Sequence, residues 1–262
     1  MSNLNILIVE GNIREDSEFF IKAAGASAAD NLKNLILKID PSIETKIINP
    51  GHDDETRKAI ENMSKYNGII FTGGAMRLND MTDVIKKHIN FASDCLNQNK
   101  KILAICWGLQ VCTTAAGGKV NPGKNGAHIG IASNVIINNN GHKHFIYKDK
   151  KNEFTTPAFN FDEVSELPKN ATLLSSDKVN NVMGVSFNAG NSEITGLQYH
   201  PDYEYYQMIN LIAGRKERLF KNKNFLNEEE YQKHISYIKA ENELLNFEDR
   251  TCEVRNWLNH IK

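Results

Sequence analysis

The stretch Lys101-Ile102-Leu103-Ala104-Ile105-Cys106-Trp107-Gly108-Leu109-Gln110 decides the fold of this chain. A short aliphatic run ends at a cysteine, and the residues from Leu109 to Ala116 suit a helix. This order predicts a strand, a sharp turn that exposes the thiol, and a helix. The N-terminal amides of such a helix favour a thiolate and can hold an oxyanion. A buried structural cysteine at a strand end would also fit these ten residues.

Strands and helices alternate through roughly the first 117 residues. We predict strands at 5–9, 43–49 and 68–72 before the one that ends at Ile105, and helices at 28–39, 53–63 and 84–96. The polar, small-residue segment that follows Gly11 is interpreted as a connection. Strands that alternate with helices at this spacing predict an α/β fold, with a mostly parallel open sheet and helices on its faces.

Beyond Gly117-Gly118 the pattern changes to short strands and polar turns, which predicts a short antiparallel insertion. Asn140-Gly141 is a favoured hairpin turn, and we place strands at 129–137 and 144–147 on either side of it. Further strands are expected at 172–175, 182–187 and 194–199, with a helix after Pro201. Polar helices are expected at 227–245 and 250–261. We therefore divide the chain into a domain at 1–220 and a C-terminal helical extension at 221–262, packed on that domain or on a partner.

Composition excludes several classes of protein. The 262 residues carry a formal net charge of −1, so no overall field favours nucleic acid or an anionic membrane. No apolar run approaches the roughly 20 residues of a membrane span, and the opening residues lack the features of a signal peptide. We therefore expect a cytoplasmic protein whose four cysteines are free thiols. The oligomeric state is left open.

Three unusual features lie where strands of the predicted sheet end, which is where open parallel sheets bind ligands. Cys106 is the first. Thr72-Gly73-Gly74-Ala75 is the second, because glycines can turn backbone N–H groups toward an anion. The third is His200-Pro201-Asp202, in which proline can start the next helix and place Asp202 in its first turn. An aspartate there can accept the imidazole N–H and orient the ring.

Together these pieces resemble the class I (triad) glutamine amidotransferase family. The resemblance covers about residues 4–215, and its closest match is to stand-alone members that resemble the amidotransferase domain of GMP synthase. The matching segments are Gly73-Gly74, Ala104-Ile105-Cys106-Trp107-Gly108-Leu109-Gln110, Phe159-Asn160-Phe161-Asp162 and Gly196-Leu197-Gln198-Tyr199-His200-Pro201-Asp202. It implies a flavodoxin-like fold and an enzyme that hydrolyses the γ-amide of glutamine through a γ-glutamyl thioester, with no metal and no cofactor.

The resemblance also implies a role for individual residues. Cys106 is the nucleophile, His200 the general base and acid, and Asp202 the residue that orients the imidazole. The remaining positions are Gly74 and Trp107 as oxyanion donors, and Gly73, Gln110 and Asn160 as substrate-binding residues. The chain departs from the family at Ala104, where glycine is usual, and at Asp202, where most members have glutamate. Phe159-Asn160-Phe161-Asp162 also departs from the usual Ser-His before the aspartate.

Three functions stay open from the sequence. In the first, the chain is a glutaminase that supplies ammonia to a separate acceptor synthetase, its partner. In the second, it is a free-standing hydrolase of γ-glutamyl amides or peptides. In the third, favoured by the departures at Asp202 and Phe159-Asn160-Phe161, it is a catalytically silent scaffold or binding protein.

Overall fold

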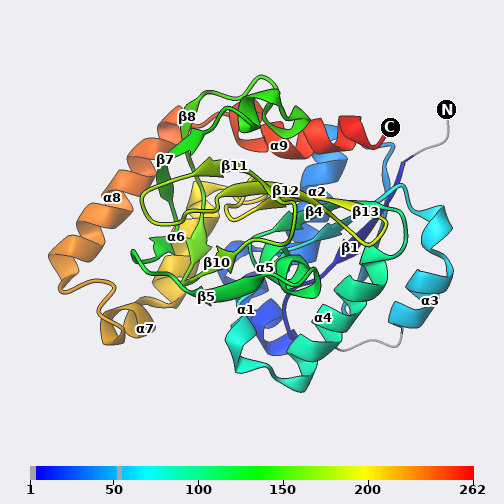
Figure 1. Ribbon diagram of the computed structural model, residues 1–262. Coiled ribbons are helices and arrows are strands. Elements are labelled where there is room, and N and C mark those ends of the chain that lie inside the picture. The colour runs from blue at the N-terminus through cyan, green and yellow to red at the C-terminus, as the bar shows by residue number, and fades with distance from the viewer. Residues whose placement is uncertain (1–3, 52–54) are drawn as a thin grey trace.

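The computed structural model describes residues 4–51 and 55–262 as an α/β protein (Figure 1). The main sheet contains β1 (Asn5–Val9), β2 (Glu44–Ile48), β3 (Gly68–Phe71), β4 (Lys101–Ile105), β7 (Ala132–Ile137), β8 (Glu153–Thr156), β11 (Thr172–Ser176), β12 (Gly184–Ala189) and β13 (Ser192–Leu197). Two small antiparallel pairs are formed by β5 (Lys119–Pro122) with β10 (Asp162–Glu166), and by β6 (His128–Ile129) with β9 (Phe159–Asn160).

The helices are α1 (Arg14–Ala24), α2 (Ala28–Ile39), α3 (Glu55–Glu61), α4 (Asp83–Leu96), α5 (Trp107–Ala115), α6 (Tyr205–Gly214), α7 (Lys216–Lys221), α8 (Glu228–Leu244) and α9 (Phe247–His260). Short 3-10 turns lie at η1 (Met63–Lys65), η2 (Leu78–Asp80), η3 (Gly141–Lys143) and η4 (Phe145–Tyr147).

The main sheet has the order β2-β1-β3-β4-β13-β12-β11-β7-β8. The first five strands are parallel and the others pair antiparallel. β13 lies beside β4, with Leu197 paired to Ile105. This pairing brings the segment after β13 next to the residue after β4, although the two are more than ninety positions apart in sequence. The predicted fold class is confirmed.

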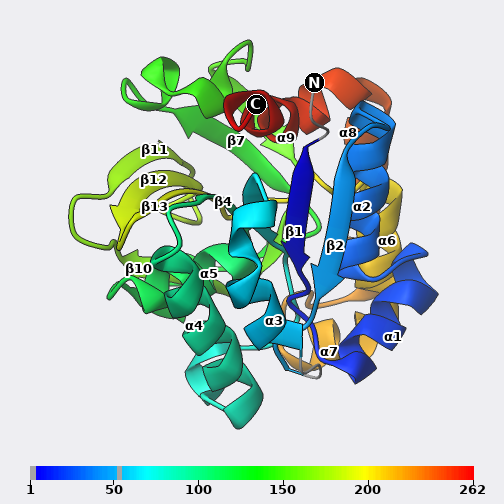
Figure 2. The same ribbon diagram turned by 90° about the vertical axis from the view of Figure 1, so that its right-hand side faces the viewer.

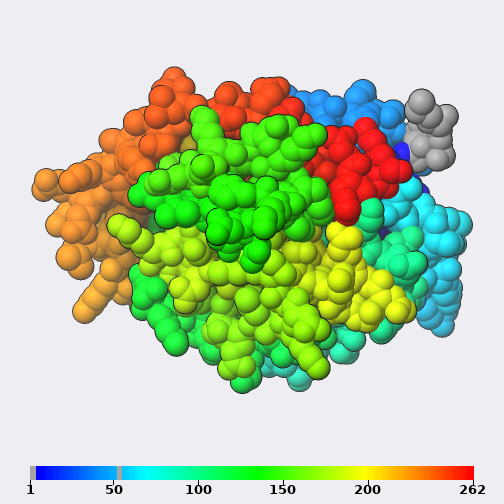
Figure 3. All heavy atoms as spheres, turned by 45° about the horizontal axis from the view of Figure 1, so that its top comes forward, coloured from blue at the N-terminus to red at the C-terminus, as the bar shows by residue number. Residues whose placement is uncertain are grey.

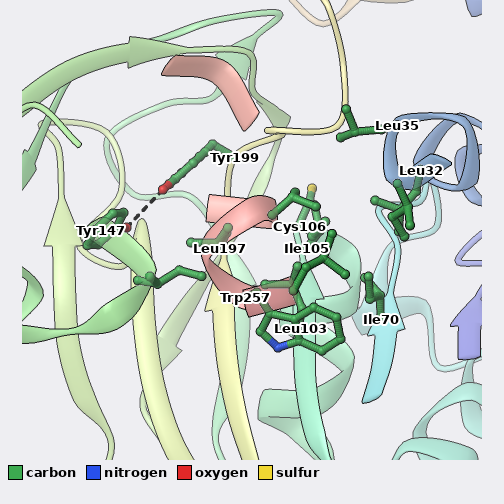
Figure 4. Close-up of a cluster of buried hydrophobic side chains, with 14 of the residues drawn as sticks. Leu32, Leu35, Ile70, Leu103, Ile105, Cys106, Tyr147, Leu197, Tyr199 and Trp257 are labelled. Carbon is green, nitrogen blue, oxygen red and sulfur yellow. Dashed lines mark hydrogen bonds between the residues drawn. The ribbon is translucent and has the colours of Figure 1, made fainter. Parts of the chain in front are cut away.

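The central parallel strands are buried because helices cover both of their faces (Figure 2). On one face, Ile70, Leu103 and Ile105 pack with Leu32 and Leu35 of α2 and with Trp257 of α9 (Figure 4). On the other face, alternate residues of the same strands pack with α3, α4 and α5. The period-two alternation of side chains across a strand explains why one aliphatic run serves both layers.

Two local predictions were wrong. The segment after Gly11 contains α1, whose apolar residues gather in its second half, where Phe20 and Ala24 pack against α6. These tertiary contacts stabilise the helix, so it forms although its sequence shows no full helical period. At the expected hairpin turn, Asn140 has φ −77 and ψ −40, whereas the favoured turn needs positive φ. The predicted strand at 144–147 is instead η4, and β7 pairs with β8.

The other predicted elements lie close to observed ones, although the strand expected at 129–137 is divided into β6 and β7. The sequence did not predict β5, β8, β9, β10 and α7. The helix predicted at 53–63 is observed as α3, and its first two predicted residues lie outside the described part of the chain. The C-terminal helices pack on the rest of the protein, α8 against α6 and α9 against η4. In Figure 3 the C-terminal residues, in red, lie directly beside the green segment that contains η4. Within residues 4–51 and 55–262, no helix has the length and apolarity needed to cross a bilayer.

Candidate active site

Cys106 occupies a sharp turn between β4 and α5. Its backbone has φ 50 and ψ −107, a conformation that costs a non-glycine residue about 1–3 kcal/mol. The turn packs tightly against the end of β3, because a Cβ at Gly108 would lie 2.5 Å from the Phe71 carbonyl oxygen. The Gly108 N–H also donates to the Thr72 carbonyl at 3.1 Å. α5 begins at Trp107, two residues earlier than predicted, so its first turn directly follows the thiol.

The Cys106 side chain is buried and lines a pocket. Only 4% of the residue is exposed, so the expectation of an exposed thiol was wrong. The S–H donates to the Phe159 carbonyl at 3.7 Å, and Gln198 Nε2 donates to Sγ at 3.4 Å. Figure 4 shows the Cys106 sulfur at one end of the labelled cluster, on the side away from Leu103. Access to the thiol is therefore through the pocket rather than across an open surface.

His200 lies between Cys106 and Asp202. Its Nδ1 is 3.1 Å from Asp202 Oδ1, and its ring packs edge-on against Tyr203 with centroids 5.2 Å apart. Asp202 is not in a helix as predicted, because α6 starts at Tyr205 with Glu204 as its N-cap. It lies instead in the turn after Pro201, and its Oδ2 is buried without a hydrogen-bond partner among the described residues.

The environment of His200 favours the imidazolium. Burial opposes the charged form, but the negative charges of Cys106 and Asp202, with hydrogen bonds from the ring to both, raise the pKa of His200 to about 10. A ring with this pKa is protonated at neutral pH. The site therefore places a sulfur nucleophile beside a protonated imidazole that can act as a proton donor.

Gly73 and Gly74 line the pocket beside His200. A Cβ at Gly73 would lie 2.5 Å from His200 Cε1, and one at Gly74 would lie 2.4 Å from the Gly11 carbonyl oxygen. Only glycine lets the backbone approach this closely. The loop is held by the segment after β1, because the Ala75 N–H donates to Asn12 Oδ1 at 2.8 Å.

Sequence reasoning missed the support that Glu10 and Asn12 give to this loop. Glu10 Oε1 accepts from the backbone and side chain of Asn12, and its Oε2 accepts from the Ala29 N–H at the start of α2. Both residues are buried. The sequence does show a carboxylate and an amide directly after a predicted buried strand. Polar side chains at such a position need hydrogen-bond partners, and this could have pointed to their role.

Gln110 and Asn160 also line the pocket, but their amides are engaged with the protein. Gln110 Nε2 and Asn160 Nδ2 each donate to the Asp162 carbonyl at 3.0 Å. Asn160 Oδ1 faces His128 Nδ1 at 2.8 Å. Arg77 forms an ion pair with the Asp162 carboxylate.

The structure brings seven of the eight predicted site residues to one pocket, and Asp202 lies behind the His200 ring. The seven are Gly73, Gly74, Cys106, Trp107, Gln110, Asn160 and His200. No cluster of three or more His, Cys, Asp or Glu side chains suited to a metal occurs within residues 4–51 and 55–262.

Helix α9 forms hydrogen bonds with the segment that follows His200. Arg250, which is buried, donates from Nη1 to the carbonyls of Pro201 at 3.0 Å and Tyr203 at 3.4 Å, and its Nη2 pairs with Glu204 at 3.2 Å. The Tyr199 hydroxyl donates to Glu253 Oε1 at 2.7 Å. The C-terminal helix thus contacts the backbone on both sides of Asp202, a link that the sequence did not reveal.

Replacement of Arg250 by methionine is expected to lower the free energy of unfolding by about 2–4 kcal/mol, because two buried carbonyls lose their donor. Urea denaturation measures this change. Arg255→Met is the matched control on the same helix, since the Arg255 guanidinium bonds its own helix, at the Glu248 carbonyl. We expect a loss below about 1 kcal/mol there. Equal losses in the two variants would contradict the role of Arg250.

Comparison with known proteins agrees with the geometry. Residues 21–211 match the family described as Glutamine amidotransferase class-I. A Pseudomonas sp protein named gamma-glutamyl-L-1-hydroxyisopropylamide hydrolase is 26% identical over 280 residues, spanning 100% of this chain and 94% of that protein. Gamma-glutamyl peptidase 3 of Arabidopsis thaliana is 31% identical over 159 residues, which cover 59% of this chain and 63% of the peptidase.

Two further comparisons extend this result. A glutamine-hydrolyzing GMP synthase subunit from Methanococcus vannielii is 31% identical over 153 residues, or 58% of this chain and 73% of that protein. A solved glutamine amidotransferase from Thermotoga maritima has the same fold, with a TM-score of 0.71 at 17% identity over 100% of this chain and 99% of that one. The expectation of an enzyme of the C–N hydrolase type is confirmed, and the chain belongs to the class-I glutamine amidotransferase family.

Proposed function

We propose that this protein hydrolyses γ-glutamyl amides, with Cys106, His200 and Asp202 as a catalytic triad. The observation that carries the proposal is the placement of the His200 ring between the Asp202 carboxylate and the Cys106 thiol, in a pocket walled by Gly73 and Gly74. A thiolate, an oriented imidazolium and a glycine-lined backbone wall are the groups that acyl transfer from an amide requires.

The reaction begins when the Cys106 thiolate attacks the γ-carbonyl carbon. The carbonyl oxygen becomes an oxyanion, which the N–H groups of Gly74 and Trp107 stabilise, each donor contributing roughly 10² to 10³ in rate. The C–N bond then breaks as His200 gives its proton to the leaving nitrogen, so that ammonia or an amine departs and a thioester remains. Water attacks the thioester, His200 takes the proton of that water, and the C–S bond breaks to release glutamate.

A free-standing hydrolase is the form of this function that we favour. The Pseudomonas sp relative aligned along the whole chain is named as the hydrolase of a γ-glutamyl amide that carries a substituted amine. The pocket also extends past the thiol to side chains of α1 and α6, among them Phe20, Met208 and Leu211. Such apolar surface can accept an organic substituent on the leaving nitrogen.

Supply of ammonia to a separate synthetase is the second candidate. Its support is the similarity to the Methanococcus vannielii protein, which is named as one subunit of a glutamine-hydrolyzing GMP synthase. In that case glutamine is the substrate and an acceptor synthetase the partner. A catalytically silent scaffold is disfavoured, because Asp202 reaches His200 despite being one methylene shorter than glutamate.

The test uses the purified protein without a partner. We expect release of ammonia from glutamine and of ethylamine from γ-glutamyl ethylamide, and stoichiometric labelling of Cys106 by a glutamine-analogue electrophile. Faster release from the ethylamide supports the free-standing hydrolase. Turnover of glutamine only, at a rate that rises when a synthetase is added, supports the second candidate. A folded protein that is neither labelled nor active refutes both.

A further inference from the structure

Two arginines at the junction of α6 and α7, Arg215 and Arg218, line part of the pocket and form what we call its cationic wall. Arg215 and Arg218 both line the pocket there, together with Phe20 and Phe159. Arg215 is the residue between the two helices, and Arg218 is the third residue of α7. None of these four residues belongs to the triad or to the glycine loop, so this wall is available for another part of the substrate.

The Arg215 guanidinium is held by aromatic rings and has no counter-ion in contact. It lies 4.5 Å from the ring centroid of Phe19, 5.2 Å from that of Phe20 and 5.1 Å from that of Phe159. Within residues 4–51 and 55–262, no carboxylate pairs with it within 4.0 Å and no group accepts a hydrogen bond from it. Asp16 acts on it only from a greater distance. The stacked rings fix the side chain while its N–H donors stay unused.

The electrostatics of the wall favour an anion. Burial and the neighbouring charge of Arg218 lower the pKa of Arg215 to about 10, so the guanidinium is still charged at neutral pH but is poorly compensated. A half-buried cation beside a second cation is stabilised by any carboxylate that enters the pocket. Arginine is well suited to that partner because its planar fork binds a carboxylate through two parallel hydrogen bonds.

A series of ring contacts connects the His200 side of the pocket to Arg215. His200 packs against Tyr203, the Tyr203 ring packs against Phe20 at 6.3 Å, and Phe20 packs against Arg215. In the proposed reaction His200 protonates the leaving nitrogen, so the amine extends along this side. Gln110, by contrast, bonds the Asp162 carbonyl, and Asp162 is tied to Arg77 rather than to this wall.

We propose that Arg215 binds a carboxylate on the leaving amine, so that γ-glutamyl amino acids and γ-glutamyl peptides are preferred over glutamine and neutral γ-glutamyl amides. This inference rests on the proposed function, because it assigns the substrate class of the same pocket. Arg215 is a specificity residue, and Phe20 and Phe159 supply apolar surface for the side chain of the released amino acid.

The test compares two substrates that differ only in charge, γ-glutamyl-alanine and γ-glutamyl-alaninamide. For the unmodified protein we expect kcat/KM to be about 10- to 100-fold higher for the carboxylate, the range that a charge-assisted bidentate contact provides. Arg215→Met should bring the ratio close to 1, and Arg215→Lys should keep part of it. The ratio is the readout because a change in folding or in thiol reactivity alters both rates together.

Arg57→Met is the matched control, because it removes one positive charge from an exposed side chain on α3 that pairs with Glu61 on the same helix. It should keep the full ratio. A ratio near 1 in the unmodified protein, or an unchanged ratio in Arg215→Met, overturns the inference while amide hydrolysis stands. If Arg215→Met does not fold, Arg215→Lys and the ratio of the unmodified protein decide in the same way. Hydrolysis of neither substrate nor of glutamine refutes the proposed function itself.

Discussion

Replacement of Cys106 by alanine is expected to lower kcat for γ-glutamyl amide hydrolysis by about 10⁴- to 10⁶-fold, the range seen when the nucleophile of an acyl-transfer enzyme is removed. No other thiol can replace it, because Cys95, Cys112 and Cys252 are buried and none of them lines the pocket. Steady-state release of amine or ammonia measures the loss. Cys112→Ala is the matched control, since Cys112 lies on α5, the helix that follows Cys106, and this variant should keep near-normal kcat.

The strained turn adds a prediction about stability to the same position. We expect both Cys106→Ala and Cys106→Gly to be inactive, but glycine adopts the backbone conformation at φ 50 without a Cβ clash. We therefore expect Cys106→Gly to be about 1 kcal/mol more stable than Cys106→Ala, after the larger chain entropy of glycine is counted. Urea denaturation compares the two. An alanine variant that is the more stable of the pair would mean that the turn relaxes and stores no strain.

The sequence could predict the elements whose signals are local. The aliphatic run before Cys106 predicts β4, and alternation with amphipathic helices predicts a parallel sheet. Because strand ends in such a sheet share one edge, the meeting of Cys106, Gly73 and His200 at one pocket follows from their places after strands. The residues that the motifs pointed to lie at that edge or directly behind it, and the roles given to them stay predictions.

Features that depend on tertiary packing could not be predicted. The apolar residues of α1 gather in its second half and pack against α6, so the sequence shows no full helical period there. Arg250 reaches the Pro201 carbonyl from 49 positions away, and a charged residue in a polar helix ordinarily suggests an exposed face. The cationic wall is similar, because Arg215 becomes distinctive only when three rings surround it.

Asp202→Asn is expected to lower kcat by about 10² to 10⁴-fold, because an amide neither stabilises the imidazolium nor fixes the tautomer of His200. Asp202→Glu should cost about 10-fold, since it keeps the charge but must fit one more methylene into a site where the carboxylate is fully buried. Steady-state kinetics on one γ-glutamyl amide gives the order. A larger loss in the glutamate variant would mean that fit, rather than charge, limits this position.

The pH dependence separates an electrostatic role of Asp202 from a structural one. His200 must be protonated to release the amine, so activity should fall as the pH rises through its pKa of about 10. Asp202→Asn removes one of the two negative charges that raise this pKa, and the alkaline limb of the profile should move to lower pH. Asp202→Glu should leave the limb near its original position. Asp83→Asn, which removes the charge of an exposed carboxylate paired with Lys86, should change neither the limb nor kcat. An alkaline limb that stays in place in Asp202→Asn would show that the carboxylate does not act on the proton of His200.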